Sequence, residues 1–236
     1  WSGGNDRFWT QMTHETFGYF DLLKILTSHP SQRYGRNNRW DWLGVVNEPC
    51  FEAPSGPDPN RFGLWLDRRQ ADCAADPFEN EQRYPGVAIG ARGRTMPVGS
   101  FYGQASGVLG LRLFPNPDFD EAARRRWDPE RYYSDPSYYL DRALVRPYRV
   151  GMSCGFCHVG PDPTRPPEDP ESPRFANLSS IVGAQYMWVD RLFIPDSRPD
   201  NFMFQLVHTY RPGSMDTSLV STDNINNPRT MNAFYA

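Results

Sequence analysis

The feature that most constrains this chain is a run of two cysteines and a histidine in its second half. Cys154 and Cys157 lie three positions apart, and His158 follows at once. This spacing is typical of covalent haem attachment, in which both thiols bond to the haem vinyl groups and the imidazole binds the iron. With so few cysteines and histidines, the run arises by chance in roughly one such chain per thousand. The sequence therefore predicts one haem c, attached at Cys154 and Cys157, with His158 as the proximal iron ligand.

Three other interpretations of these residues stay open. A thioredoxin-like dithiol is expected at a helix start after a strand, but the approach over 146–151 is too short to show a βαβ unit. A structural zinc site needs a second ligand pair of similar spacing, whereas Cys50 and Cys73 are 23 positions apart and have no histidine beside them. The third interpretation is chance. Haem attachment fits the spacing best.

Composition bounds the fold. The chain has 236 residues, 39% of them hydrophobic, which suits one large domain or two small ones. A net charge of −3 leaves no basic surface for nucleic acid, and no apolar run approaches the 18 residues of a membrane span. The 23 prolines and 19 glycines predict many turns and long irregular connections. We expect a mainly α fold with extensive irregular structure, in which long loops and a few short strands wrap a cytochrome c-like haem region.

Two regions are expected: a helical and loop-rich part over 1–140, and a haem-binding part over 141–236 that continues past the chain end. They could also form one compact domain. Apolar periodicity predicts a helix over 5–28 that ends at His29-Pro30, with Leu23 and Leu26 on its core face. Further helices are expected over 120–127, 177–193 and 200–209. The glycine-rich stretch 85–115 predicts short strands and close backbone passages, and the proline-rich stretch 161–173 predicts an extended surface strap.

Aspartate precedes proline six times, and each pair predicts a turn or a helix start. The ring of proline presets φ, and the carboxylate can accept a hydrogen bond from a nearby amide. The pairs are Asp58-Pro59, Asp76-Pro77, Asp128-Pro129, Asp135-Pro136, Asp162-Pro163 and Asp169-Pro170.

The remaining cysteines predict a disulfide. Haem is attached covalently outside the cytoplasm, where unpaired cysteines tend to oxidise. We therefore expect a Cys50–Cys73 bond and a periplasmic or extracellular location. Closing a loop of this size stabilises a fold by roughly 3 kcal/mol on the chain-entropy model.

The presence of a sixth iron ligand distinguishes the two functions. An electron carrier usually has protein ligands on both sides of the iron, whereas an oxygenase or peroxidase leaves one side open. His208, the last histidine of the chain, is the candidate that we favour over Met187, Met203 and Met215. Arg191 and Arg211, with Arg229 as a further candidate, could pair with the haem propionates. Five tyrosines before the motif could line an apolar pocket or simply pack.

A family resemblance rests on the motif and on the residues C-terminal to it. Residues 153–161, the proline-rich strap, Asn177-Leu178-Ser179-Ser180 and Gly183-Ala184-Gln185-Tyr186 resemble the first haem region of large secreted bacterial c-type cytochromes related to the rubber oxygenases. The di-haem cytochrome c peroxidases are a more distant likeness. The resemblance covers the chain from the haem motif to its end. It implies a secreted protein, sparse secondary structure around haem and two haem sites in one chain.

Only one haem motif is present, so the chain is either the N-terminal portion of a di-haem protein or a one-haem relative. Its start at Trp1 suggests a trimmed product, and its last residues predict the start of another helix. The function predicted is single-electron transfer to a redox partner protein, with membership of a larger cytochrome assembly open. The alternative is a haem-dependent oxygenase or peroxidase. A third possibility is a subunit in which haem only stabilises the fold.

Overall fold

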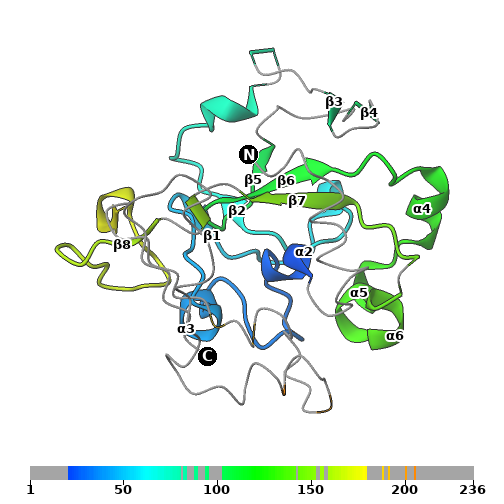
Figure 1. Cartoon of the computed structure of the whole chain (residues 1–236), viewed down its shortest axis with the longest axis horizontal. Coiled ribbons are helices and arrows are strands. Elements are labelled where there is room, and N and C mark those ends of the chain that lie inside the picture. Colours follow the sequence, from blue (N-terminus) through cyan, green and yellow to red (C-terminus); the bar gives the residue numbers. More distant parts are fainter. Residues whose placement is uncertain are drawn as a thin grey trace, which may run out of the picture.

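The computed structural model describes residues 21–80, 82–83, 88–89, 94–95, 103–141, 143–152, 155–156, 159–179, 188, 191, 200 and 205. Its centre is a three-stranded antiparallel sheet in the order β5-β6-β7 (Figure 1). The strands are β5 (Gln104–Ala105), β6 (Leu111–Pro115) and β7 (Tyr148–Met152). In the register, Leu111 faces Met152 and Pro115 faces Tyr148. The sheet therefore joins residues from both of the regions that the sequence suggested.

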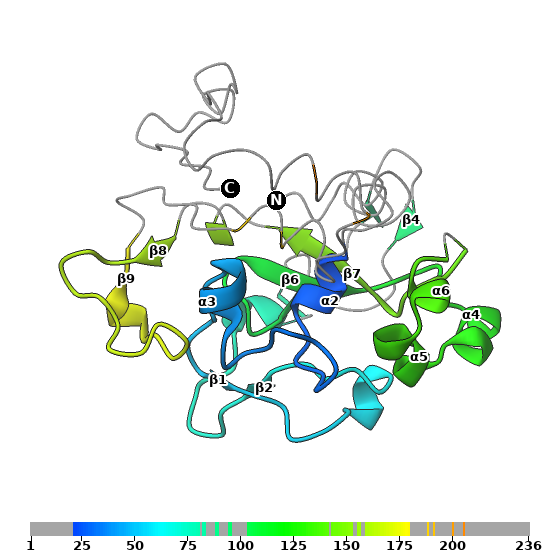
Figure 2. The same cartoon turned by 90° about the horizontal axis from the view of Figure 1, so that it is seen from below.

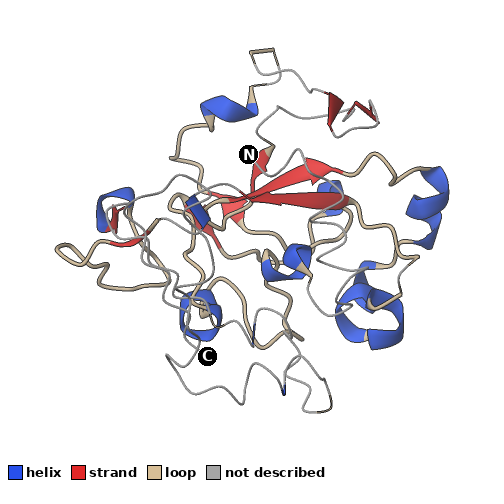
Figure 3. Cartoon of the chain, in the orientation of Figure 1, coloured by secondary structure: helices blue, strands red, loops and turns tan. Residues whose placement is uncertain are grey.

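The described helices are short. The α-helices are α2 (Leu22–Ile25), α3 (Arg39–Leu43), α4 (Glu121–Arg126), α5 (Pro129–Ser134) and α6 (Pro136–Tyr139), and the 3-10 helices are η3 (Pro59–Arg61), η4 (Pro77–Glu79) and η5 (Phe175–Asn177). Two-stranded antiparallel sheets join β1 (Phe51–Glu52) to β2 (Arg68–Arg69), β3 (Ala88–Ile89) to β4 (Arg94–Thr95), and β8 (Gly160–Pro161) to β9 (Leu178–Ser179). Figure 3 shows how much loop lies between them.

The prediction of a mainly α fold is wrong. No α-helix in the described part exceeds six residues, and antiparallel sheets occupy the centre. The cause lies in the backbone: Gly44 takes a left-handed conformation and ends α3, while Asp135 ends α5 and caps α6. At α3 and α5, glycine and an Asp-Pro pair end the helix before a second or third turn can form.

The helix expected over 5–28 does not run through as one element. Asp21 has extended backbone angles (φ −124°, ψ 94°), and its carboxylate accepts hydrogen bonds from the amides of Leu23 and Lys24. Asp21 is thus the N-cap of a new helix, which ends at Ile25. Leu23 and Leu26 are buried as predicted. Residues 1–20 lie outside the described part.

The helix expected over 177–193 does not begin where the capping pattern placed it. Asn177 is the last residue of η5, and Leu178 and Ser179 pair with Pro161 and Gly160 as strand β9. Pairing with a strand on the far side of the strap overrides the local helix signal here. Trp188 and Arg191 are the only described residues over 180–193.

Several other local predictions are confirmed, whereas the helix expected over 200–209 lies outside the described residues except for Asp200 and Gln205. Helix α4 lies within the expected 120–127, and β3 to β6 fall in or beside the glycine-rich stretch. The aspartates of four Asp-Pro pairs, Asp58, Asp76, Asp128 and Asp135, cap helices. Those of the other two, Asp162 and Asp169, accept a hydrogen bond from the amide two residues further on.

One apolar core lies between the central sheet and the helices. Many of its most deeply buried members lie in or next to α2, α3, the 64–66 segment, β6 and α5: Leu22, Ile25, Leu26, Leu43, Leu64, Leu66, Val108, Leu111, Leu113 and Tyr132. Trp42, Met152 and Phe156 are among the partly buried residues that pack against this core.

Candidate functional site

The cysteine-histidine motif follows the end of β7. Met152 is the last residue of that strand, Gly155 and Phe156 are helical, and β8 begins at Gly160. The Val159 amide donates a hydrogen bond to the Gly155 carbonyl at 3.1 Å. An amide bonded to the carbonyl four residues earlier is the bond of an α-helical turn. The described residues of this stretch, Gly155, Phe156 and Val159, thus show one α-helical hydrogen bond between β7 and β8.

The predicted haem residues themselves lie outside the described part of the chain. This holds for Cys154, Cys157 and His158, for the favoured sixth ligand His208, and for Arg211. The alternative ligands Met187, Met203 and Met215, and the third arginine, Arg229, are outside it as well. These assignments stay predictions, and Arg191 is the one predicted site residue that the structure places.

Gly110 fixes the position of the motif against the central sheet. It precedes β6 and has a left-handed φ of +79°. A Cβ atom on it would overlap the backbone nitrogen and Cα of Phe156 and the carbonyl carbon of Gly155. Both the conformation and the close approach require glycine. The sequence predicted close backbone passages here but not the partner, because the two segments are more than forty residues apart.

The strap after the motif is fastened to helix α3. The Glu171 carboxylate accepts hydrogen bonds from the amides of Trp40 and Asp41, each at 2.9 Å. The Asn47 side chain donates to the backbone carbonyl of Glu171 at 2.8 Å. An acidic group at a helix amino end satisfies free amides there. Figures 1 and 2 both show α3 near β8, so the strap crosses from the motif to this helix.

Helix α3 is itself held by a buried ion-pair cluster. Asp67 accepts from Arg36 at 2.9 Å and from Arg39 at 3.0 Å, and the Asp67 and Arg39 side chains are fully buried. Arg39 also donates to the Asn47 side chain at 2.5 Å. The cluster joins three chain segments, so no local sequence signal could have found it.

Arg191 lies between two tryptophan rings. Its guanidinium carbon is 4.3 Å from the ring centre of Trp42 and 4.7 Å from that of Trp188. Its Nη1 donates to the backbone carbonyl of Trp42 at 2.9 Å, and the Trp188 amide donates to the Leu43 carbonyl at 3.0 Å. A guanidinium stacked on indole rings is oriented by cation–π attraction. Trp188 and Arg191 are thus attached to the end of α3.

The five tyrosines before the motif belong to the core. Tyr132, Tyr133, Tyr138, Tyr139 and Tyr148 are all buried members of it. The Tyr132 hydroxyl donates to Asp21 at 2.9 Å, and the Tyr133 hydroxyl accepts from the Trp65 amide at 3.0 Å. Burial raises the pKa of Tyr132 well above its usual value. Packing in the core accounts for these rings.

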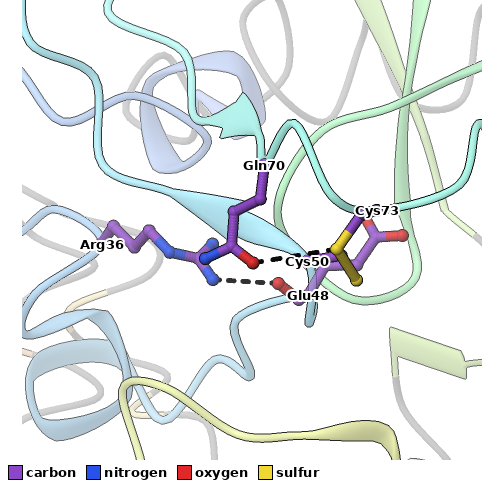
Figure 4. The surroundings of a disulfide bond; sticks show 5 residues. All are labelled: Arg36, Glu48, Cys50, Gln70 and Cys73. Carbon is purple, nitrogen blue, oxygen red and sulfur yellow. Dashed lines mark hydrogen bonds between the residues drawn. A yellow bond between two sulfur atoms is a disulfide. The ribbon is translucent and has the colours of Figure 1, made fainter.

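One carboxyl group near the disulfide has a strongly shifted pKa. Burial raises the pKa of Glu48 from 4.5 to about 7, against the opposing attraction of Arg112 and Arg69. Cys50 and Cys73 are joined in the predicted disulfide, with the Gln70 side-chain oxygen 3.8 Å from the Cys73 sulfur (Figure 4). Arg36 donates to the Glu48 backbone carbonyl at 2.9 Å beside this bond.

The described residues lack two kinds of feature. They contain no group of three or more histidine, cysteine, aspartate or glutamate side chains that could hold a metal ion. Among the same residues, no helix has the length and apolar character to cross a membrane.

Comparison with protein-family models, with curated protein sequences and with solved structures finds no match for this chain. The resemblance to the cytochromes related to the rubber oxygenases therefore stays a hypothesis that rests on the residues quoted for it.

Proposed function

We propose that this chain is a c-type cytochrome that carries one covalently bound haem and transfers single electrons. Cys154 and Cys157 would form the two thioether bonds, and His158 would bind the iron. The observation that carries the proposal is the Cys-x-x-Cys-His spacing. A haem held there would supply a one-electron iron couple, while the protein sets its surroundings and its contact with a partner.

The described neighbours of the motif support haem attachment. Gly155 and Phe156, between the two cysteines, are helical, and the Val159 amide donates an α-helical hydrogen bond to the Gly155 carbonyl. Met152 and Phe156 pack against the apolar core, which suits an apolar cofactor. Gly110, without a side chain, lets the backbone of Gly155 and Phe156 lie directly against the residue before β6. These contacts would hold the motif residues on a rigid base.

The disulfide supports the location that the proposal requires. A Cys50–Cys73 bond is compatible with an oxidising compartment, where haem c is attached. We therefore propose a periplasmic or extracellular protein that meets a redox partner there.

The test is to produce the chain in a host that attaches haem c and to measure intact mass and the visible spectrum. The expected result is one haem added to the polypeptide mass, with Soret absorbance that persists after denaturation. Replacement of Cys154 and Cys157 by alanine should abolish covalent attachment, with Cys50→Ala as a cysteine control. A colourless wild-type protein would overturn the proposal.

A second measurement separates an electron carrier from an oxygenase or peroxidase. The reduced holoprotein should give a low-spin spectrum that carbon monoxide leaves unchanged, because an iron held on both sides has no open position. A prompt spectral shift with carbon monoxide would reject the carrier and favour the enzyme.

A further inference from the structure

Arg191 differs from the other at least partly buried arginines in the described part of the chain. Seven of them lie within ion-pair distance of a carboxylate: Arg36 and Arg39 (both to Asp67), Arg61, Arg69, Arg112, Arg146 and Arg149. Arg191 has no carboxylate partner among the described residues, and its only hydrogen-bond acceptor there is the Trp42 carbonyl. A partly buried cation without an anion is costly unless a ligand supplies one.

A second donor without an acceptor lies beside it. The Trp42 indole Nε1 is buried and has no hydrogen-bond partner within the described ranges. Buried polar groups are nearly always paired, and an indole N–H can only donate. The Arg191 guanidinium lies over the ring that carries this N–H, 4.3 Å from its centre. Arginine too can only donate, so both groups require an acceptor such as a carboxylate.

Neither Asp41 of α3 nor Glu171, which is bound to this helix, pairs with Arg191. Glu171 accepts from the amides of Trp40 and Asp41 at the amino end of α3, and Asp41 is exposed to solvent. Arg191 contacts the other end of this helix, where the carbonyls of Trp42 and Leu43 accept hydrogen bonds from Arg191 and Trp188. The rings of Trp42 and Trp188 orient the guanidinium. Among its nitrogens, only Nη1 forms a hydrogen bond to a described residue.

This cluster lies in the same part of the fold as the haem motif. Trp42 and Phe156 pack against one core. The Leu109 amide donates to the Val46 carbonyl, just after α3, at 3.0 Å. The next residue, Gly110, lies directly on the backbone of Gly155 and Phe156. Two short steps therefore connect the segment after α3 to Gly155 and Phe156, which lie between the two motif cysteines in the sequence.

We propose that Arg191, clamped between Trp42 and Trp188 and joined by the Trp42 N–H, is a carboxylate-binding site whose occupant is a haem propionate. This rests on the proposed function, because the haem must be attached first. Arg191 is a binding residue for the cofactor and takes no part in attachment. The Trp42 N–H adds a second, uncharged hydrogen bond to the same carboxylate group.

The test compares the holoproteins of wild type, Arg191→Gln and Trp42→Phe by the pH dependence of the haem midpoint potential. A carboxylate beside an arginine has a pKa lowered by about 1–3 units, so Arg191→Gln should move the propionate breakpoint to higher pH by about that much. Trp42→Phe keeps the stacked ring and removes the N–H, so a smaller shift in the same direction is expected. The matched control is Arg124→Gln, because Arg124 is exposed, stacks on Phe62 and Phe119, and has no carboxylate partner in the described part. It should leave the breakpoint unchanged.

The outcomes are distinguishable. A wild-type protein without covalent haem overturns the proposed function and this inference together. Normal haem attachment with an unchanged breakpoint in Arg191→Gln overturns this inference alone. Acetate added to the holoprotein distinguishes the two sources of a carboxylate: saturable binding that Arg191→Gln abolishes would show a site for a soluble carboxylate and reject the propionate. Circular dichroism of each variant checks that it is folded. If Arg191→Gln does not fold, the conservative Trp42→Phe still tests the proposal.

Discussion

Asp67 is the single carboxylate on which two buried arginines converge. Replacing it with asparagine would leave Arg36 and Arg39 buried without a counter-charge, and breaking a buried pair in this way costs about 3–5 kcal/mol. We expect Asp67→Asn to lower the free energy of unfolding by that amount in urea titrations. Glu121→Gln is the control, since its exposed pair with Arg125 is worth less than about 1 kcal/mol. Equal effects of the two substitutions would contradict the cluster's role.

Glu48 predicts a pH dependence of stability at the residue scale. Burial raises its folded-state pKa from 4.5 to about 7, so the folded protein binds a proton between these values that the unfolded chain has lost. The contribution of Glu48 is therefore fully present below pH 4.5 and is lost as the pH rises through about 7. We expect Glu48→Gln to flatten this part of the stability profile and Glu52→Gln, an exposed residue, to leave it unchanged. A wild-type profile that rises over this range and is unchanged in Glu48→Gln would be inconsistent with the shift.

The contact between Gly110 and the motif turn makes a prediction about elements. Alanine at Gly110 would meet the Phe156 backbone and would have to adopt a left-handed conformation, which alone costs about 1–3 kcal/mol. We expect Gly110→Ala to destabilise the fold by at least that much and to reduce the fraction of chains that carry haem. Gly56→Ala is the matched control, because nothing lies within 4 Å of its added Cβ. Wild-type stability of Gly110→Ala would show that the turn does not lie on β6.

The strap should loosen when its attachment to α3 is removed. Glu171→Ala removes both hydrogen bonds to the amino end of the helix, so the strap should open locally more often. The readout is cleavage by trypsin after Arg174, an exposed site, which should become several-fold faster. Glu168→Ala, an exposed position in the same strap, is the control. Equal cleavage rates in both variants and wild type would count against the anchor.

Elements with a local cause could be predicted from the sequence, and those with a distant cause could not. The aspartates of the Asp-Pro pairs cap helices or close turns because the proline and the accepting carboxylate are neighbours in the chain. By contrast, Asp21 interrupts the expected first helix, and its carboxylate binds Tyr132 and Arg146, more than a hundred residues away. The strand at Leu178 likewise depends on Pro161. Periodicity carries no information about such partners.

The same division applies to the whole molecule. The candidate haem residues follow from spacing alone, because both thiols and the imidazole belong to one short run. The contact of Gly110 with Gly155 and Phe156 does not follow from it, since these segments meet only through the tertiary fold. The expected mainly α architecture failed for a related reason. Glycine and Asp-Pro pairs end α3 and α5 after a turn or two, and the central sheet pairs β6 with β7, more than thirty residues apart.

The disulfide gives a prediction for the stability of the whole chain. Cys50 and Cys73 are 23 positions apart, and the chain-entropy model assigns roughly 3 kcal/mol to a loop of that size. The Cys50→Ser/Cys73→Ser double variant should therefore unfold at lower urea concentration than wild type. A reducing agent should bring wild type to the same value and leave the variant unchanged, because it cleaves the disulfide and not the thioether bonds of a haem. Free thiols at both positions in non-reducing peptide maps would refute the bond and would remove the support it gives to an oxidising compartment.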